Sequence, residues 1–152
     1  MFGGLFIVMQ FVPTAGKLEN GKAPRVHMQE AIDSRVGAIL DRSCEDCHSN
    51  HTRWPWYSHV APISWLLYRD VTKGRNKLDF SQWAEEPHSA NARMEICDAV
   101  SDGSMPLRGY TLLHRNARLS EHDVNLICNW ASTTEVQAFA APISGATVTT
   151  AR

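Results

Sequence analysis

The chain has 152 residues, a length that fits one domain with extensions at its ends. A hydrophobic fraction of 43% can support a core. The 15 basic and 16 acidic residues nearly cancel, so the charge gives no case for nucleic-acid binding.

The chain begins with an apolar segment over residues 2–12. About 11 residues span ~16 Å as a helix, whereas the hydrocarbon core of a bilayer is about 30 Å thick. No basic region precedes the segment and no clear cleavage site follows it. We interpret residues 1–25 as a signal remnant or hydrophobic anchor, followed by a linker or extended wrap. An ordinary buried strand or helix is the alternative for the apolar part.

A helix is predicted over residues 28–42, because apolar side chains recur there at i, i+4, i+7 and i+8. These side chains are Ile32, Val36, Ile39 and Leu40. The helix leads directly into Cys44-Glu45-Asp46-Cys47-His48.

This motif has the spacing of a covalent attachment site for a c-type haem. Two thiols add across the two vinyl groups of a haem, and the adjacent imidazole ligates the iron. Positions three apart lie on one face of a helical turn, so Cys44 and Cys47 can reach the same edge of the porphyrin. The motif therefore predicts one covalently attached haem c, with His48 as an iron ligand.

Two other sites use such a cysteine pair. A zinc site needs four ligands, and no second Cys-x-x-Cys or His-x-x-x-His pair follows in the sequence. A thioredoxin-type pair requires a surrounding βαβ pattern, which the sequence lacks. Haem attachment is therefore our working interpretation.

Residues 50–62 contain two prolines and several aromatic side chains, a composition that predicts a stiff, irregular loop. Trp54 and Trp56 lie in this loop, and Trp65 follows it. Flat, rigid side chains suit the walls of a haem pocket, so we assign these three tryptophans to the pocket walls.

Two helices are predicted after the loop. The first begins at Pro62 and stops at Gly74, and the second is a short helix over residues 83–86 that Ser81 caps. The inward face of the first helix is expected to carry Ile63, Leu66, Leu67 and Val71.

Two more helices complete the pattern. One is capped by Ser89 and ended by Gly103, with Ile96, Cys97 and Val100 inward. The other begins with a capping-box-like Ser120-x-x-Asp123, and Leu119 is placed to staple against Val124. The apolar stripe of that last helix is Val124, Ile127, Cys128 and Ala131.

No strand-period run competes with these helices. The predicted fold is therefore all-α, a small cytochrome c-like helical domain over residues 26–132 wrapped around one haem. Residues 133–152 are rich in Ala, Thr, Ser, Gly and Pro, which predicts a flexible tail.

The chain resembles the bacterial haem-binding domain family, which is built around a Cys-x-Asp-Cys-His-Ser-Asn motif. The resemblance covers roughly residues 40–131. The further matching residues are Trp54-Pro55-Trp56-Tyr57-Ser58, Ala61-Pro62-x-Ser64-Trp65, Asp70-Val71, Gly74-Arg75, Phe80-Ser81-x-Trp83, Met105-Pro106, Tyr110, His114 and Leu119-Ser120. It implies a periplasmic or membrane-attached c-type haem protein, often with an N-terminal hydrophobic anchor.

Met105 is our first choice for the second axial ligand. It lies between Gly103 and Pro106, on a loop that can present a thioether with little freedom to lose. Filling a gap in the core is the alternative for a lone methionine, and Met94 is a weaker candidate because it falls within a predicted helix. His59 and His114 are candidates for bis-His ligation. The remaining histidines, His27, His51, His88 and His122, are assigned to solvent.

Arg53, Arg75 and Tyr110 are candidate partners of the haem propionates, because a buried carboxylate needs charged or hydrogen-bonding partners. A surface role or core packing is the alternative for each. Cys97 and Cys128 remain as an even pair, either a disulfide or two buried free thiols.

An iron with both axial positions filled suits one-electron transfer. We therefore expect an electron carrier, not an enzyme, that works with redox proteins or a larger membrane complex on the periplasmic side of a bacterial membrane. The alternatives are a haem-bearing accessory subunit, or a sensor or peroxidase-like protein with a displaceable distal ligand.

Overall fold

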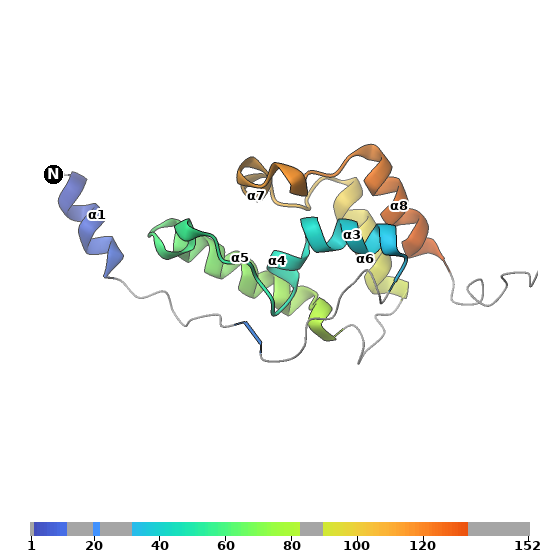
Figure 1. Cartoon of the computed structure of the whole chain (residues 1–152), viewed down its shortest axis with the longest axis horizontal. Coiled ribbons are helices and arrows are strands. Elements are labelled where there is room, and N and C mark those ends of the chain that lie inside the picture. The colour runs from blue at the N-terminus through green and yellow to red at the C-terminus, as the bar shows by residue number, and fades with distance from the viewer. Residues whose placement is uncertain (1, 12–19, 22–31, 83–89, 134–152) are drawn as a thin grey trace, which may run out of the picture.

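The computed structural model describes residues 2–11, 20–21, 32–82 and 90–133. These residues contain helices and no strand, which confirms the all-α prediction (Figure 1). The α-helices are α1 (Phe2–Gln10), α3 (Ser34–Ser43), α4 (Glu45–His48), α5 (Ile63–Lys77), α6 (Ala90–Ser101), α7 (Arg108–Leu113) and α8 (Glu121–Ser132). The 3-10 helices are η1 (Trp56–His59), η2 (Phe80–Gln82) and η3 (Arg115–Ala117).

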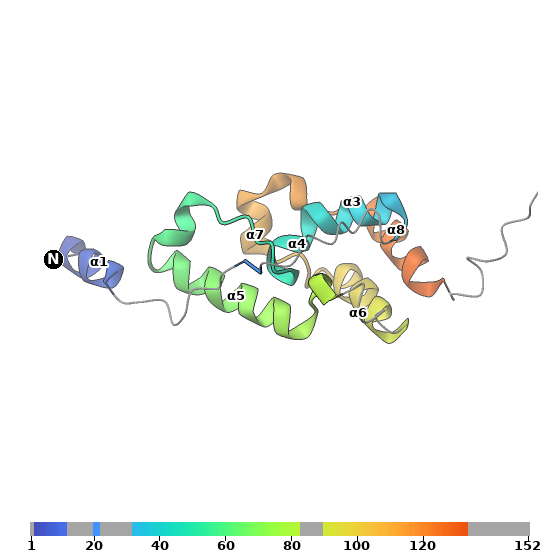
Figure 2. The ribbon, with the colours of Figure 1, turned by 60° about the horizontal axis from the view of Figure 1, so that its bottom comes forward.

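The hydrophobic core lies where α3, α6, α8 and η2 meet. Its buried side chains are Val36, Ile39, Leu40, Phe80, Ile96, Val100 and Ile127. Each contributes about 1.5–3 kcal/mol when fully buried. The apolar stripes that the sequence predicted lie on α3, α6 and α8, and they meet in this one core. In Figure 2, α4 lies between this core and α5.

Helix α3 begins later than predicted. Asp33 is its N-cap, and a side-chain oxygen of Asp33 accepts a hydrogen bond from the backbone N–H of Arg35 at 2.9 Å. A side chain that binds the first free N–H groups fixes the start of a helix, so Ile32 precedes α3 although it still packs against the core.

Helix α5 corrects two expectations. It continues through Gly74 to Lys77, and its buried positions are Ser64, Val71 and Gly74. Ile63 and Leu66 are 41% and 49% exposed, so they do not form the inward face. The reason is the close approach of α5 to α4, which the smallest side chains permit.

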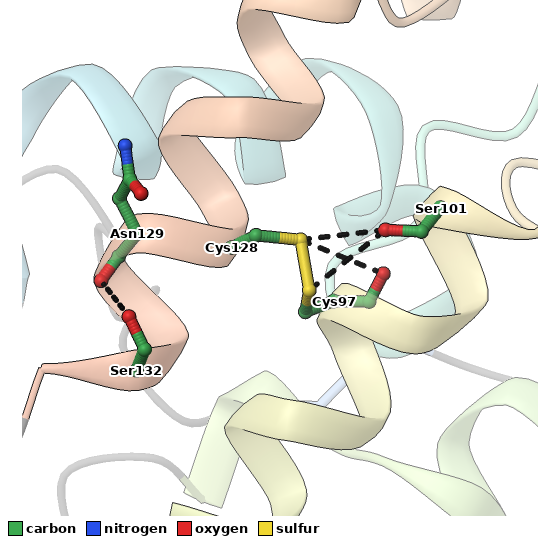
Figure 3. Close-up of a disulfide and its surroundings, with 5 residues drawn as sticks. All are labelled: Cys97, Ser101, Cys128, Asn129 and Ser132. Atoms are coloured by element: carbon green, nitrogen blue, oxygen red, sulfur yellow. Dashed lines mark hydrogen bonds between the residues drawn. A yellow bond between two sulfur atoms is a disulfide. The ribbon is translucent and has the colours of Figure 1, made fainter.

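A disulfide joins Cys97 on α6 to Cys128 on α8 (Figure 3). The sequence left open a disulfide or two free thiols at these positions, and the structure has the disulfide. The hydroxyl oxygen of Ser101 lies 3.4 Å from the sulfur of Cys128. Closing a loop with a sequence separation of 31 is worth about 3–4 kcal/mol in lost entropy of the unfolded chain.

Helix α8 begins as predicted. Ser120 accepts from the N–H of Asp123, and Asp123 accepts from the N–H of Ser120, which completes the capping box. Helix α6 is followed by Gly103 at φ 72°, the left-handed conformation that favours glycine. Helix α7 and η3 were not predicted, because residues 107–118 carry no long apolar stripe.

The N-terminal residues touch the 50–62 loop. The side chain of Gln10 at the end of α1 makes two hydrogen bonds with the backbone of Ala61, at 3.0 and 3.2 Å. The backbone N–H of Gly21 donates to the carbonyl of Asn50 at 2.9 Å. No helix within the described ranges is long and apolar enough to cross a membrane. Most of the predicted linker and of the predicted tail lie outside the described residues, and so does the whole helix predicted over residues 83–86.

Candidate haem site

The Cys-x-x-Cys-His motif forms one helical turn that continues from α3. The N–H groups of Cys47 and His48 both donate to the carbonyl of Cys44, at 3.1 and 3.0 Å, and the N–H of Cys44 donates to Leu40 at 2.8 Å. Because Leu40 is fully buried, the core fixes where this turn begins. Cys44 and Cys47 are free thiols and half-buried.

Both thiols are held in their neutral form. Burial, with Cys47 beside it, raises the pKa of Cys44 to about 12. Burial and then the carboxylates of Asp46 and Asp70 raise the pKa of Cys47 to about 11. The thiolate is the form that attacks disulfides, so this environment does not suit a redox-active pair.

His48 is oriented by the backbone of the segment that follows α5. Its Nδ1 lies 3.1 Å from the carbonyl oxygen of Leu78, which can only accept, so Nδ1 carries the hydrogen. Burial lowers the pKa of His48 and favours the neutral ring. The second nitrogen, Nε2, then keeps its lone pair for a metal, an arrangement typical of ligating histidines.

Gly74 sets the distance between α5 and the motif. A Cβ at this position would lie 2.5 Å from the carbonyl oxygen of Cys47, closer than carbon and oxygen atoms pack. Only glycine lets α5 come this near. One turn later, the N–H of Leu78 donates to the carbonyl of Gly74 at 2.9 Å, and the carbonyl of Leu78 meets His48.

Two cavities of about 220 and 410 Å³ adjoin the motif and share Cys44, His48, Lys77 and Met105 as lining residues. The smaller cavity extends to the apolar face of α6. The larger one extends between α5 and the segment 105–110, and its volume lies within the ~300–1,000 Å³ range of small-molecule sites. The predicted ligands His48 and Met105 therefore border the same space.

Met105 sits on a loop held by three hydrogen bonds. Its N–H donates to the carbonyl of Ala99 at 3.0 Å, and Ser104 donates from its N–H to Asp102 and from its hydroxyl to Ala99. A loop held in this way presents the thioether with little entropy to lose.

The residues present fit a haem. Two thiols three positions apart, a neutral imidazole and a thioether surround one cavity system with mainly apolar walls. In the part of the chain that the structure describes, no cluster of three or more His, Cys, Asp or Glu residues could hold a separate metal ion. When bound, the haem would be held by Cys44, Cys47, His48 and Met105, and it would supply one-electron redox chemistry.

Asp46, inside the motif, ties the site to the rest of the fold. Its carboxylate accepts from the hydroxyl of Tyr110 at 2.8 Å and from the guanidinium of Arg53 at 2.9 Å. Its backbone carbonyl accepts from Thr52 at 2.7 Å. Burial and then the Asp46 carboxylate raise the pKa of Tyr110. Asp46 thereby connects the motif to the loop after α4 and to helix α7.

The predicted propionate partners have other contacts in this structure. Arg75 donates to the carbonyl of Ser49 and to the hydroxyl of Thr52, and Arg53 pairs with Asp46. Tyr110 lines the larger cavity, whereas neither arginine is among the described residues that line the two cavities. Arg53 and Arg75 therefore hold the 49–53 backbone here, and their binding to propionates stays a prediction.

Cationic side chains that sequence reasoning missed line the larger cavity from α5. They are Arg69, Lys73 and Lys77. Arg69 pairs with Asp70 and Lys77 with Glu95, each at 2.7 Å. These residues recur every four positions, which places them on one face of α5. This spacing could have identified them from the sequence.

The tryptophans lie elsewhere than expected. Trp56 is 80% exposed on η1, and Trp65 lines a shallow groove at the start of α5 with Pro62, Ile63, Leu66 and Arg69. None of Trp54, Trp56 and Trp65 is among the described residues lining the two cavities at His48. The reason is that the 50–62 loop leads away from the motif toward the far end of α5 (Figure 1).

The histidine alternatives to Met105 are placed differently from it. His114 stacks on Tyr110 at a centroid distance of 4.2 Å, and its two nitrogens lie 3.3 Å from the Tyr57 hydroxyl and 3.2 Å from the Tyr110 carbonyl. His59 is exposed on η1. Neither of these histidines is among the described lining residues of the two cavities.

A family model described as a haem-binding domain matches residues 4–133. The chain belongs to the haem-binding domain family. The match extends further toward the N-terminus than the resemblance over residues 40–131, and it includes most of the apolar helix α1. No curated protein and no solved structure gave a significant match. The site around His48 is the place in this haem-binding domain where the described geometry accommodates the cofactor.

Proposed function

We propose that this haem-binding domain is a monohaem c-type cytochrome, an electron carrier and not an enzyme. Cys44 and Cys47 would form the two thioether bonds, and His48 and Met105 would be the axial ligands. The observation that carries the proposal is the placement of His48 and Met105 on shared cavities, with Nδ1 of His48 bound to the carbonyl of Leu78.

Filled axial positions favour electron transfer over chemistry on a substrate, because no iron position is open. The protein contributes a neutral imidazole, a restrained thioether loop and apolar walls that exclude water. A thioether ligand also raises the reduction potential relative to a second histidine.

We further propose that the domain works on the periplasmic side of a bacterial membrane, with membrane contact through its N-terminus. The Cys97–Cys128 disulfide supports this location, because disulfides persist in oxidising compartments. Its partners would be redox proteins or the subunits of a larger membrane electron-transfer complex.

Met105→Ala tests the ligand assignment. The wild-type protein, matured in a bacterial periplasm, should be low-spin in both oxidation states. The variant should lose the weak ferric sulfur-to-iron band near the red edge and become high-spin. Met94→Ala is the matched control, because Met94 is 40% exposed on α6 and should leave both spectra unchanged. A low-spin, unchanged Met105→Ala spectrum would remove Met105 as the ligand. A wild-type high-spin spectrum that responds to carbon monoxide would favour a sensor or peroxidase-like protein.

A further inference from the structure

The segment that forms α7 and η3 carries positive charge without acidic residues. Between Asp102 and Glu121 the sequence has no Asp or Glu, but it has Arg108, Arg115 and Arg118. All three arginines are exposed, and none forms an ion pair with another described residue. This part of the surface therefore presents a local excess of positive charge.

The same segment exposes large apolar side chains. Leu112 and Leu113 are 68% and 62% exposed, and Leu107 is also exposed. We call these three leucines together with Arg108, Arg115 and Arg118 the α7 patch. Neighbouring exposed leucines on a helix that faces solvent are typical of an interaction surface.

The leucines face outward because the opposite side of α7 is anchored. Tyr110 donates to Asp46, and His114 stacks on Tyr110 and lies 3.3 Å from the hydroxyl of Tyr57. With residues 110 and 114 bound inward, Leu112 lies on the opposite face of α7, and Leu113, the last residue of the helix, is exposed as well. Their exposure is thus built into the way the helix is held.

The α7 patch also borders the haem site. Leu107, together with Met105, Pro106 and Tyr110, lines the larger cavity. Helix α7 lies at the outer edge of the molecule in both views (Figures 1 and 2). A redox partner that covered the α7 patch would therefore contact Leu107, which is part of the wall of the larger cavity.

We propose that the α7 patch is the docking surface for a redox protein with an acidic surface. This inference rests on the proposed electron-transfer function. The exposed leucines and the arginines of this patch would complement a partner surface that has an apolar centre and acidic residues at its rim. Protein interfaces commonly have such an apolar centre and polar rim, with opposite charges facing each other. A lipid surface fits less well, because α7 has only six residues and its one aromatic side chain, Tyr110, is turned inward to Asp46.

The first test uses small redox reagents on the holoprotein. Arg108→Gln/Arg115→Gln should slow oxidation of the ferrous protein by hexacyanoferrate(III) roughly three- to ten-fold at low ionic strength and speed oxidation by tris(phenanthroline)cobalt(III). The differences should vanish in high salt. Asn91→Glu/Asn125→Glu is the control, because it changes the net charge by the same amount at exposed positions on α6 and α8. Equal effects of the two double variants would overturn the proposal.

The second test uses a protein partner, a plant-type ferredoxin, as a small acidic donor of one electron to the ferric domain. Leu112→Ser/Leu113→Ser should weaken its binding and slow the electron transfer several-fold, while the hexacyanoferrate rate stays unchanged. If this variant binds ferredoxin as tightly as the wild type does, the proposal is overturned. The proposal is also overturned if the variant keeps its ferredoxin binding and instead loses binding to anionic phosphatidylserine vesicles. Calorimetric titration of the ferric domain with oxidised ferredoxin measures docking without electron transfer. A domain that docks ferredoxin but exchanges no electrons would refute the proposed function and leave the docking surface intact.

Discussion

Replacing Gly74 by alanine tests how the approach of α5 shapes the haem site. The new Cβ would lie 2.5 Å from the carbonyl oxygen of Cys47 and 3.1 Å from its carbonyl carbon. Close carbon–oxygen contacts in proteins are about 3.3–3.6 Å, so α5 must move by roughly 1 Å relative to α4. Both atoms belong to the backbone, so no side-chain rotation can relieve the clash.

The cost follows from these contacts. Overpacking a core typically costs about 1–3 kcal/mol, and weakening the hydrogen bond between His48 and Leu78 adds about 0.5–1.5 kcal/mol. Alanine regains about 0.5–1 kcal/mol through its higher helix propensity. We therefore expect Gly74→Ala to lower the free energy of unfolding by about 0.5–4 kcal/mol in a urea titration. The visible spectrum should also report a disturbed His48 ligand.

Gly109→Ala is the matched control. Gly109 lies in α7, and a Cβ there meets no atom within 4 Å, so this variant should be as stable as the wild type or slightly more so. If Gly74→Ala unfolds at the same urea concentration as the wild type and keeps its spectrum, the close approach of α5 does not position His48.

Two further predictions concern the core. Cys97→Ser/Cys128→Ser should lower the free energy of unfolding by about 3–4 kcal/mol in urea, and an unchanged midpoint would mean that the disulfide does not constrain the unfolded chain. Burial alone would raise the pKa of Asp123, but Ser120 and Arg42 together hold it below its ordinary value. This carboxylate therefore adds stability above its ordinary pKa, and the added stability is lost as pH falls through the lowered pKa of the folded state. Asp123→Asn should flatten the decline in stability between pH 7 and 3, and an identical decline in both proteins would refute this.

Helices α3, α6 and α8 were predictable, because their stripes and caps are local signals. The period of Val36, Ile39 and Leu40 and the capping box of Ser120 need no knowledge of the partner helices. The error at the start of α3 also has a local cause, because Asp33 is the N-cap of that helix.

The rest of the site depends on which segments meet in space. Gly74 looked like a helix stop, because its contact with Cys47 lies 27 residues away in the chain. Tyr110 donates to Asp46, which is 64 residues earlier in the chain, and no signal in the sequence indicated that contact. The tryptophans follow the motif in sequence, but the loop carries them away from it. Sequence proximity and residue type alone could not distinguish these arrangements.

The most direct measurement is the intact mass of the purified protein after maturation in a bacterial periplasm. The protein should have the mass of the polypeptide plus one haem that survives denaturation, with Cys44 and Cys47 inaccessible to thiol reagents. A mass equal to the bare polypeptide, with both thiols free to react, would contradict this prediction.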